Sequence, residues 1–216
     1  MALSHNIADI RINYSKKELT EDVVSKDPLQ QFSTWLQEAI EAEVLEPTAF
    51  VLSTVDNRNR PSSRVLLLKD VSENGFTFFT NYESRKGRCI EENPFVALTF
   101  FWPELERQVR IEGQVRKVDT GFSDDYFHSR PRGSQIGAWA SPQSREISSR
   151  SVLEDAGKRY EIEFADKELV PRPPHWGGYS LSPDYIEFWQ GRPNRLHDRI
   201  VFEKQETTWL TKRLAP

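Results

Sequence analysis

The chain has 216 residues, of which 37% are hydrophobic, and its formal net charge is −4 at pH 7. This size fits one domain of ordinary size, with or without terminal extensions. The negative charge disfavours a general nucleic-acid-binding role, so any basic site must be local. Cys89 is the single cysteine, which excludes an internal disulfide and favours a reducing compartment.

Targeting and metal-binding signals are absent from the sequence pattern. Residues 1–12 lack the apolar segment of a secretory signal, and no apolar run is long enough to span a bilayer. No Cys/His cluster has the spacing of a zinc site. We therefore expect a soluble cytoplasmic protein without a metal site, a membrane partner or a nucleic-acid partner.

The first part of the chain predicts an arm followed by a helix. Residues 1–26 are polar with few apolar anchors, so we expect a flexible arm there and a single domain over residues 27–216. Asp27 and Pro28 predict a helix start, with Asp27 as the N-cap. The helix should end before Pro47. Its predicted apolar face consists of residues at helical spacing: Leu29, Phe32, Leu36, Ile40 and Val44.

The remaining chain predicts short strands interrupted by helices. Asn74 and Gly75 form a strong hairpin signal between two strands. Strands are expected at 49–55, 64–69, 76–80, 95–102, 108–118, 186–190, 200–203 and 208–214. Helical segments are expected at 84–92, 124–129 and 148–164. The pattern favours a mainly β protein, a β-barrel with peripheral helices.

A basic segment near the C-terminus suggests an anionic, aromatic ligand. Residues 188–199 combine three arginines, one histidine and Trp189 around a Gly/Pro break. Strand alternation would place Arg195, His197 and Arg199 on one face, where they would repel each other without anions to bind. A solvated strand edge and a core role for Trp189 remain open alternatives.

Three further clusters have the residue types of anion sites. Arg64 and Lys69 bracket a short strand. Ser84 precedes two cations, Arg85 and Lys86, at a predicted helix start, where free N–H groups favour phosphate. An equally good interpretation is that Ser84 only caps the helix and that both cations are solvated.

The third cluster combines Tyr126, Arg130 and Ser134. Tyr126 and Arg130 are four residues apart and can share a helical face, where they and Ser134 can hold an oxyanion. A capped helix end is the alternative. The neutral groups of Gln108, Gln143 and Ser144 suit a heteroaromatic ring that has both donors and acceptors.

A series of motifs in these same regions closely resembles the pyridoxamine 5′-phosphate oxidase family, also called pyridoxine 5′-phosphate oxidase. The matching stretches follow the family's order at 64–69, 79–86, 107–110, 126–132, 134–138, 176–178, 187–191, 195–199 and 213–216. The resemblance implies an FMN-binding split β-barrel and a homodimer with shared active sites. It also implies a C-terminal dimerisation and substrate segment.

The resemblance further implies an oxidoreductase of vitamin B6 salvage and pyridoxine biosynthesis. This flavoprotein would oxidise pyridoxamine 5′-phosphate and pyridoxine 5′-phosphate to pyridoxal 5′-phosphate. O2 would be the acceptor, giving H2O2, and the amine would also give NH3. We expect hydride transfer from the substrate C4′ to flavin N5. The alternatives are a split-barrel FMN reductase that uses NAD(P)H, and a non-catalytic protein that binds pyridoxal phosphate or FMN.

The same resemblance implies roles for individual residues. Those expected to bind FMN are Arg64, Val65, Leu66, Leu67, Leu68, Lys69, Phe79, Thr80, Arg85, Lys86, Gln108, Gln143, Ser144, Trp189 and Arg199. Those expected to bind the substrate are Lys69, Tyr126, Arg130, Ser134, Arg195, Leu196 and His197, together with Arg11 and Tyr14 of the arm. Arg195 and His197 are the expected catalytic residues.

Overall fold

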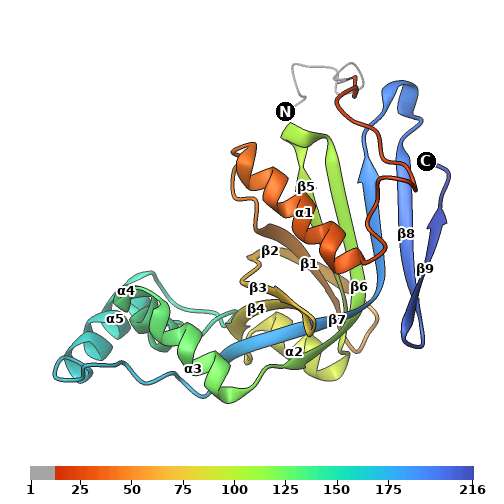
Figure 1. Ribbon diagram of the computed structural model, residues 1–216. Coiled ribbons are helices and arrows are strands. Elements are labelled where there is room, and N and C mark those ends of the chain that lie inside the picture. Colours follow the sequence, from red (N-terminus) through yellow and green to blue (C-terminus); the bar gives the residue numbers. More distant parts are fainter. Residues whose placement is uncertain (1–12) are drawn as a thin grey trace, which may run out of the picture. The chain divides into compact units, whose positions relative to one another are not determined.

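The computed structural model describes residues 13–216 (Figure 1). The described chain forms two compact units. We call the first the terminal unit; it holds the residues up to Pro47, Thr99–Ile111 and Asp184–Pro216. The second, the central unit, holds Thr48–Leu98 and Glu112–Pro183.

The strands form one hydrogen-bonded series in the order β2-β1-β5-β6-β7-β4-β3, and β8 pairs with both β7 and β9. The predicted mainly β class is confirmed. Three strands, β5, β6 and β7, contribute residues to both units. The bounds are β1 Ala49–Val55, β2 Pro61–Leu67, β3 Asp70–Ser72, β4 Gly75–Asn81, β5 Phe95–Trp102, β6 Arg107–Lys117, β7 Trp176–Gln190, β8 Asp198–Gln205 and β9 Thr208–Arg213.

The terminal unit contains the first helix, α1 (Pro28–Glu41). It begins as predicted, because the Asp27 side chain accepts a hydrogen bond from the backbone N–H of Leu29. Its buried face differs from the predicted apolar face, since Ile40 is 48% exposed. The buried positions include Gln31, and they follow a stripe shifted around the helix: Pro28, Gln31, Phe32, Trp35 and Ala39.

The shift has a physical cause in the aromatic core of this unit. The Phe32 ring contacts Phe100 at a centroid distance of 4.9 Å, and Trp35 contacts Phe188 at 5.2 Å. The Arg107 guanidinium lies over the Trp35 ring, 4.2 Å from its centroid. Two large aromatic side chains thus determine which face of α1 is buried, in preference to the aliphatic stripe.

The central unit contains four helices within the described range: α2 (Arg85–Glu92), α3 (Thr120–Ser129), α4 (Arg132–Ala140) and α5 (Ser151–Glu163). Ser84 caps α2 by accepting a hydrogen bond from the Gly87 N–H. Helix α4 is absent from the sequence prediction, which gave no helix between residues 129 and 148. It packs against α5 in the central unit (Figure 1).

Near the predicted basic sites, the strands begin and end at other residues than the sequence predicted. Strand β2 ends at Leu67, so Lys69 lies beyond it and is not part of a regular strand. The C-terminal basic segment is not a strand between Gln190, where β7 ends, and Asp198, where β8 begins. Residues Pro193–Arg195 form a 3-10 turn, and both Asn194 and Arg195 have positive φ, 57° and 64°. The predicted alternation of Arg195, His197 and Arg199 on one strand face is therefore wrong.

Part of the predicted arm makes specific contacts within the terminal unit. Leu19 is 3% exposed, and its N–H donates to the Asp198 carboxylate at 3.0 Å. Arg213 forms an ion pair with Glu21 at 2.8 Å. The division into an arm over residues 1–26 and a single domain over 27–216 remains a prediction. No helix of the described chain is long and apolar enough to cross a membrane.

Replacing Gly87 by alanine is expected to lower the free energy of unfolding by roughly 3 kcal/mol. A Cβ there would lie 1.9 Å from the Tyr82 carbonyl oxygen, which is backbone and cannot swing away. Urea unfolding measures the change. Gly157→Ala in α5 is the matched control, because nothing lies within 4 Å of its added Cβ. That variant should gain about 0.5–1 kcal/mol from helix propensity. Equal values for the two variants would contradict the prediction.

Candidate active site

A cavity of about 510 Å³ in the central unit gathers residues from both predicted ligand lists. Residues of the predicted cofactor list that line it are Val65, Leu66, Leu67, Lys69, Phe79, Thr80 and Gln143. Residues of the predicted substrate list that line it are Lys69, Tyr126, Arg130 and Ser134. Helices α3 and α4 and strands β2 and β4 thus bring together side chains that are far apart in sequence.

One wall of this cavity is a stack of three aromatic rings. The Phe79 and Tyr126 rings stack at a centroid distance of 4.0 Å, and Phe79 and Trp176 stack at 5.5 Å with an interplanar angle of 13°. Gly178 makes room for Phe79, because an added Cβ would lie 2.8 Å from its ring. Stacked rings fix the orientation of the Tyr126 hydroxyl and give the cavity a flat, rigid side.

Arg130 contributes a cation with one buried nitrogen that has no hydrogen-bond partner in the described chain. Its guanidinium lies 4.6 Å from the centroid of the Trp176 ring. Its Nη1 atom is buried and has no hydrogen-bond partner in the described chain. Burial lowers the pKa of Arg130 below its ordinary value. A buried guanidinium nitrogen without a partner is costly, and an anionic oxygen would satisfy it.

A second cationic group forms where β2, β4 and α2 meet. The Lys86 ammonium donates to the Thr80 hydroxyl at 3.1 Å and to the Gln143 side-chain oxygen at 3.0 Å. Arg64 donates to the Thr54 hydroxyl at 2.9 Å and to the Ser62 hydroxyl at 2.7 Å. All of these partners are neutral.

The charges in this group repel each other and are not neutralised. Burial, followed by the nearby charge of Arg64, lowers the pKa of Lys86 from 10.5 to about 8. Burial likewise lowers the pKa of Arg64, and the charge of Arg85 adds to that effect. Over residues 13–216, none of these three cations has a carboxylate partner. Such a group is suited to bind a phosphate.

The terminal unit holds a separate group of predicted site residues. The Trp189 and His197 rings are 4.7 Å apart, and the Tyr14 ring contacts them edge-on at 5.7 Å and 5.8 Å respectively. Tyr14 also lies against Gly191, where an added Cβ would be 2.7 Å from its Cγ atom. Arg195 and Leu196 are exposed beside this aromatic cluster.

The hydrogen bonding of His197 defines its tautomer. The Arg192 backbone N–H donates to Nδ1 at 3.0 Å, so neutral His197 carries its proton on Nε2. Partial burial and the charge of Arg195 lower the pKa of His197, while Asp198 opposes the shift. Near neutral pH the imidazole is therefore mainly neutral, with an N–H available at Nε2.

Arg199 is oriented by a buried carboxylate. Glu187, 2% exposed, accepts from Arg199 Nε at 3.0 Å and from Nη2 at 2.9 Å. It also accepts from the Tyr185 hydroxyl at 3.0 Å. Burial raises the pKa of Glu187, but the hydrogen bonds from Arg199 and Tyr185 outweigh that effect and hold it below its ordinary value. The bidentate pair fixes the plane of the guanidinium.

Some predicted site residues lie apart from these groups. Gln108 belongs to the terminal unit, and Ser144 is exposed with a positive φ of 69°. Leu68 is buried in the core. Arg11 lies outside the described residues. Among residues 13–216, no group of three or more His, Cys, Asp or Glu side chains could hold a metal ion.

Three residues that were not predicted as site residues also line the cavity: Asn81, Ser141 and Trp176. The signal for Trp176 was a Trp-Gly-Gly sequence at the start of a strand, where small residues allow close approach. Asn81 and Ser141 carry no sequence signal of their own.

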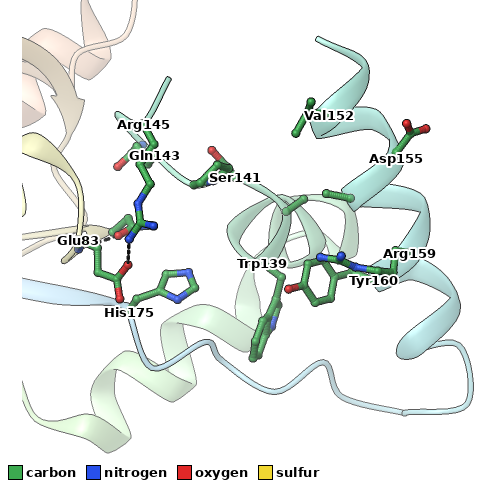
Figure 2. A pocket seen from close by; sticks show the side chains of 14 residues that line it. Glu83, Trp139, Ser141, Gln143, Arg145, Val152, Asp155, Arg159, Tyr160 and His175 are labelled. Carbon is green, nitrogen blue, oxygen red and sulfur yellow. Dashed lines mark hydrogen bonds and ion pairs between the residues drawn. The ribbon is translucent and has the colours of Figure 1, made fainter. Parts of the chain in front are cut away.

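Asn81, Ser141 and Gln143 also line a second cavity, of about 610 Å³, in the same unit (Figure 2). Its cations are already engaged, because Arg145 pairs with Glu83 at 2.9 Å and Arg159 lies over a tyrosine ring.

These features define a class of protein: a split β-barrel whose cavity carries unpaired cations and a stacked aromatic wall. A protein from Nostoc punctiforme, described as a pyridoxamine 5′-phosphate oxidase-related, FMN-binding protein, superposes with a TM-score of 0.69 at 16% identity. It covers 89% of this chain and 100% of its own. That likeness concerns the fold alone, and the predicted split-barrel fold class is confirmed.

The chain belongs to the pyridoxamine 5′-phosphate oxidase family, as predicted. The family's sequence profile matches residues 36–162. A second profile, the pyridoxine 5′-phosphate oxidase C-terminal dimerisation region, matches residues 176–216.

Relatives support this membership over nearly the whole chain. A pyridoxine/pyridoxamine 5′-phosphate oxidase from Cyanothece sp. is 56% identical over 98% of this chain and 99% of its own length. The protein of the same name from Neisseria gonorrhoeae is 54% identical over 98% of this chain and 100% of its own. PhzG from Burkholderia lata, solved with tetrahydrophenazine-1-carboxylic acid, is 32% identical with a TM-score of 0.85, covering 90% of this chain and 95% of its own.

Proposed function

We propose that this protein oxidises pyridoxamine 5′-phosphate and pyridoxine 5′-phosphate to pyridoxal 5′-phosphate, with FMN as cofactor and O2 as acceptor. The observation that carries the proposal is a pair of cationic groups. Arg130 lines the cavity, and Lys86 donates to Thr80 and Gln143, which also line it. The Arg64/Lys86 group lacks carboxylate partners, and Arg130 has a buried, unpartnered Nη1. Two phosphorylated ligands need two such groups. The names of the relatives from Cyanothece and Neisseria, 56% and 54% identical to this chain, support the choice of reaction.

The side chains of the Arg64/Lys86 group fit the phosphate of FMN. Arg64, Arg85 and Lys86 supply the positive charge, and Thr80 and Gln143 hold the Lys86 ammonium in place. The aromatic wall and the amide of Gln143 are suited to a heteroaromatic ring. The assignments of Gln108, Ser144, Trp189 and Arg199 to the same cofactor rest on the family resemblance.

The group around Arg130 fits the phosphate of the substrate. Lys69, Tyr126, Arg130 and Ser134 all line the cavity, and the stacked rings keep Tyr126 and Arg130 in fixed positions. Binding the phosphate far from the reacting carbon uses remote binding energy to align that carbon. Arg130 gains most from the phosphate, because its buried Nη1 then has an acceptor.

Arg195 and His197 act at the reacting end of the pyridine. His197 Nε2 presents an N–H to a substrate oxygen, while its Nδ1 is held by the Arg192 amide. Arg195 is exposed and free to approach the 3-hydroxyl and the C4′ substituent. FMN, when bound, supplies the two-electron acceptor for the hydride that leaves C4′, and O2 then takes both electrons to give H2O2. With the amine substrate, one water molecule is also consumed, because its oxygen becomes the aldehyde oxygen as NH3 leaves.

A homodimer with shared sites completes the proposal. The dimerisation profile covers residues 176–216, which include Trp189, Arg195 and His197. In the central unit, the outward face of β1 and β2 exposes paired apolar residues: Val65 is 64% exposed and faces Val51 across the strand pair. An exposed apolar sheet face is suited to a second copy of the chain. The expected cytoplasmic location remains a prediction.

An anaerobic flavin titration tests the proposed function. The purified protein is reconstituted with FMN, mixed with pyridoxamine 5′-phosphate, and then exposed to air. Bleaching of the flavin band, its recovery with O2 and the appearance of pyridoxal 5′-phosphate are the expected results. Bleaching by NADPH alone would favour a reductase. A yellow protein that neither compound bleaches would favour a non-catalytic binding protein.

FMN affinity is expected to fall as pH rises above about 8. The phosphate needs the protonated form of Lys86, whose pKa in the folded protein is about 8. Above that pH the free protein has already lost the proton, so binding must take one up. The Kd should then rise by about tenfold per pH unit.

Quenching of flavin fluorescence between pH 7 and 9.5 measures this dependence. Lys86→Met should bind FMN more weakly at pH 7 and should lose the pH dependence. A slope that persists in Lys86→Met would assign the titration to another group.

A further inference from the structure

Glu106 has an unusual position in the terminal unit. It is 5% exposed and has a positive φ of 55°. Its carboxylate accepts hydrogen bonds from the backbone N–H groups of Ser15 at 2.9 Å and Lys16 at 3.0 Å. No cation pairs with this carboxylate among the described residues. Burying a carboxylate without a cation costs free energy, which the two amide hydrogen bonds offset. The carboxylate is therefore suited to bind the backbone of residues 15 and 16.

The backbone of Glu106 binds a different segment, the end of strand β7. Its carbonyl oxygen accepts from the Gly191 N–H at 2.8 Å and from the Gln190 side-chain amide at 3.2 Å. These residues directly follow Trp189 at the end of β7 (Trp176–Gln190). One residue therefore links the N-terminal segment, through its side chain, to the strand end that carries Trp189, through its backbone.

Tyr14 lies between the N-terminal segment bound by the Glu106 side chain and the end of β7 bound by the Glu106 backbone. It precedes the two amides bound by Glu106 and contacts both Trp189 and His197 with its ring. Gly191 permits this contact, because a Cβ there would lie 2.9 Å from the Tyr14 Cβ and 3.1 Å from the Glu106 Cβ. Beyond Lys16, the Lys17 and Glu18 side chains form ion pairs, and the Leu19 N–H donates to Asp198. Glu106 is thus the anchor nearest to Tyr14.

We propose that Glu106 is a positioning residue that holds Tyr14 against His197 and Trp189 and so shapes the substrate end of the site. This inference rests on the proposed function, since it gives the aromatic cluster a role in binding the phosphorylated pyridine. Glu106 does not touch the substrate; it acts through Ser15, Lys16 and Tyr14. Losing its carboxylate removes the two backbone hydrogen bonds nearest to Tyr14 and loosens the contact of the Tyr14 ring with His197.

The test combines hydrogen exchange with a double-mutant cycle on the FMN-loaded protein. Glu106→Ala should abolish the exchange protection of the Ser15 and Lys16 amides. It should also raise the KM for pyridoxamine 5′-phosphate about tenfold, with kcat within about twofold and FMN affinity unchanged. Glu106→Gln, which keeps an acceptor oxygen but not the charge, should fall between Glu106→Ala and the wild type. It also retains the side-chain volume if Glu106→Ala folds poorly.

The cycle decides whether Glu106 acts through Tyr14. In a Tyr14→Ala background, adding Glu106→Ala should raise KM no further. Independent, multiplying effects would overturn the inference, as would unchanged exchange at Ser15 and Lys16 in Glu106→Ala. Glu104→Gln is the matched control, since Glu104 contacts Lys16 through its carbonyl oxygen only; it should behave as the wild type. Wild-type turnover of pyridoxamine 5′-phosphate tests the proposed function separately, and exchange is measured without substrate.

Discussion

Replacing His197 by alanine is expected to lower kcat by about 10²–10³-fold while FMN remains bound, by analogy with the loss of one positioned donor. The structure gives the reason: Nδ1 is occupied by the Arg192 amide, so Nε2 presents its N–H in a fixed direction. Arg195→Ala should have a similar effect on turnover. Steady-state kinetics with pyridoxamine 5′-phosphate, together with the visible spectrum of each purified variant, measure both quantities.

The pH profile sharpens this prediction. His197 has a lowered pKa, so its neutral form, with the proton on Nε2, is present at and above neutral pH and is lost as the pH falls through that pKa. The acidic limb of kcat/KM should change shape in His197→Ala. His128→Ala is the matched control, because His128 lies on α3 and does not line the cavity. If His197→Ala lost FMN but kept full activity when FMN was resupplied, the assignment of the two sites would be wrong.

Replacing Arg64 by alanine is expected to weaken FMN binding by about 10–100-fold, which corresponds to the loss of one or two charge-assisted hydrogen bonds. The guanidinium is half-buried and is held by the carbonyl oxygen of Leu52 and the hydroxyls of Thr54 and Ser62. Because no carboxylate competes for it among the described residues, its charge is available to a phosphate. Equilibrium titration of the apoprotein with FMN measures the change.

Arg60→Ala provides the control for Arg64→Ala on the same strand pair. Arg60 lies in the turn that precedes β2, where its exposed side chain pairs with Asp56. It should bind FMN as the wild type does. Turnover of Arg64→Ala at saturating FMN should recover most of the wild-type kcat, because the residue acts on the phosphate end of the cofactor. An unchanged FMN affinity in Arg64→Ala would remove this arginine from the cofactor site.

Local sequence signals predicted the starts of α1 and α2 and the presence of most strands, whereas α3 begins four residues before its predicted start. Asp27 and Ser84 act as N-caps, as expected, because capping depends on the side chain and the next few backbone amides. Strand β1 has the predicted limits, since its alternation of buried and exposed residues needs only one partner face. Helix α4 escaped prediction because it starts directly after Pro131 without a capping side chain.

The C-terminal basic segment shows where periodicity misleads. The alternation of Arg195, His197 and Arg199 suggested one strand face, but positive φ values at Asn194 and Arg195 turn the chain before β8 begins at Asp198. The geometric argument for Arg195 and His197 was wrong, so their assignment to the site rests on the family resemblance and stays a prediction. The alternation of residue types along the chain cannot reveal a turn, such as the one at Pro193–Arg195, that contacts with other segments stabilise.

By itself, the sequence determined the fold class, the family and the identity of the cationic residues, because these depend on residue types in a fixed order. Only the tertiary structure decided which cations remain without partners. Arg199 is paired with Glu187, whereas Arg130 retains a buried, unpartnered nitrogen. It also revealed that Glu106 binds the segment carrying Tyr14. Those partners are far apart along the chain, and charge pairing depends on distances that only folding sets.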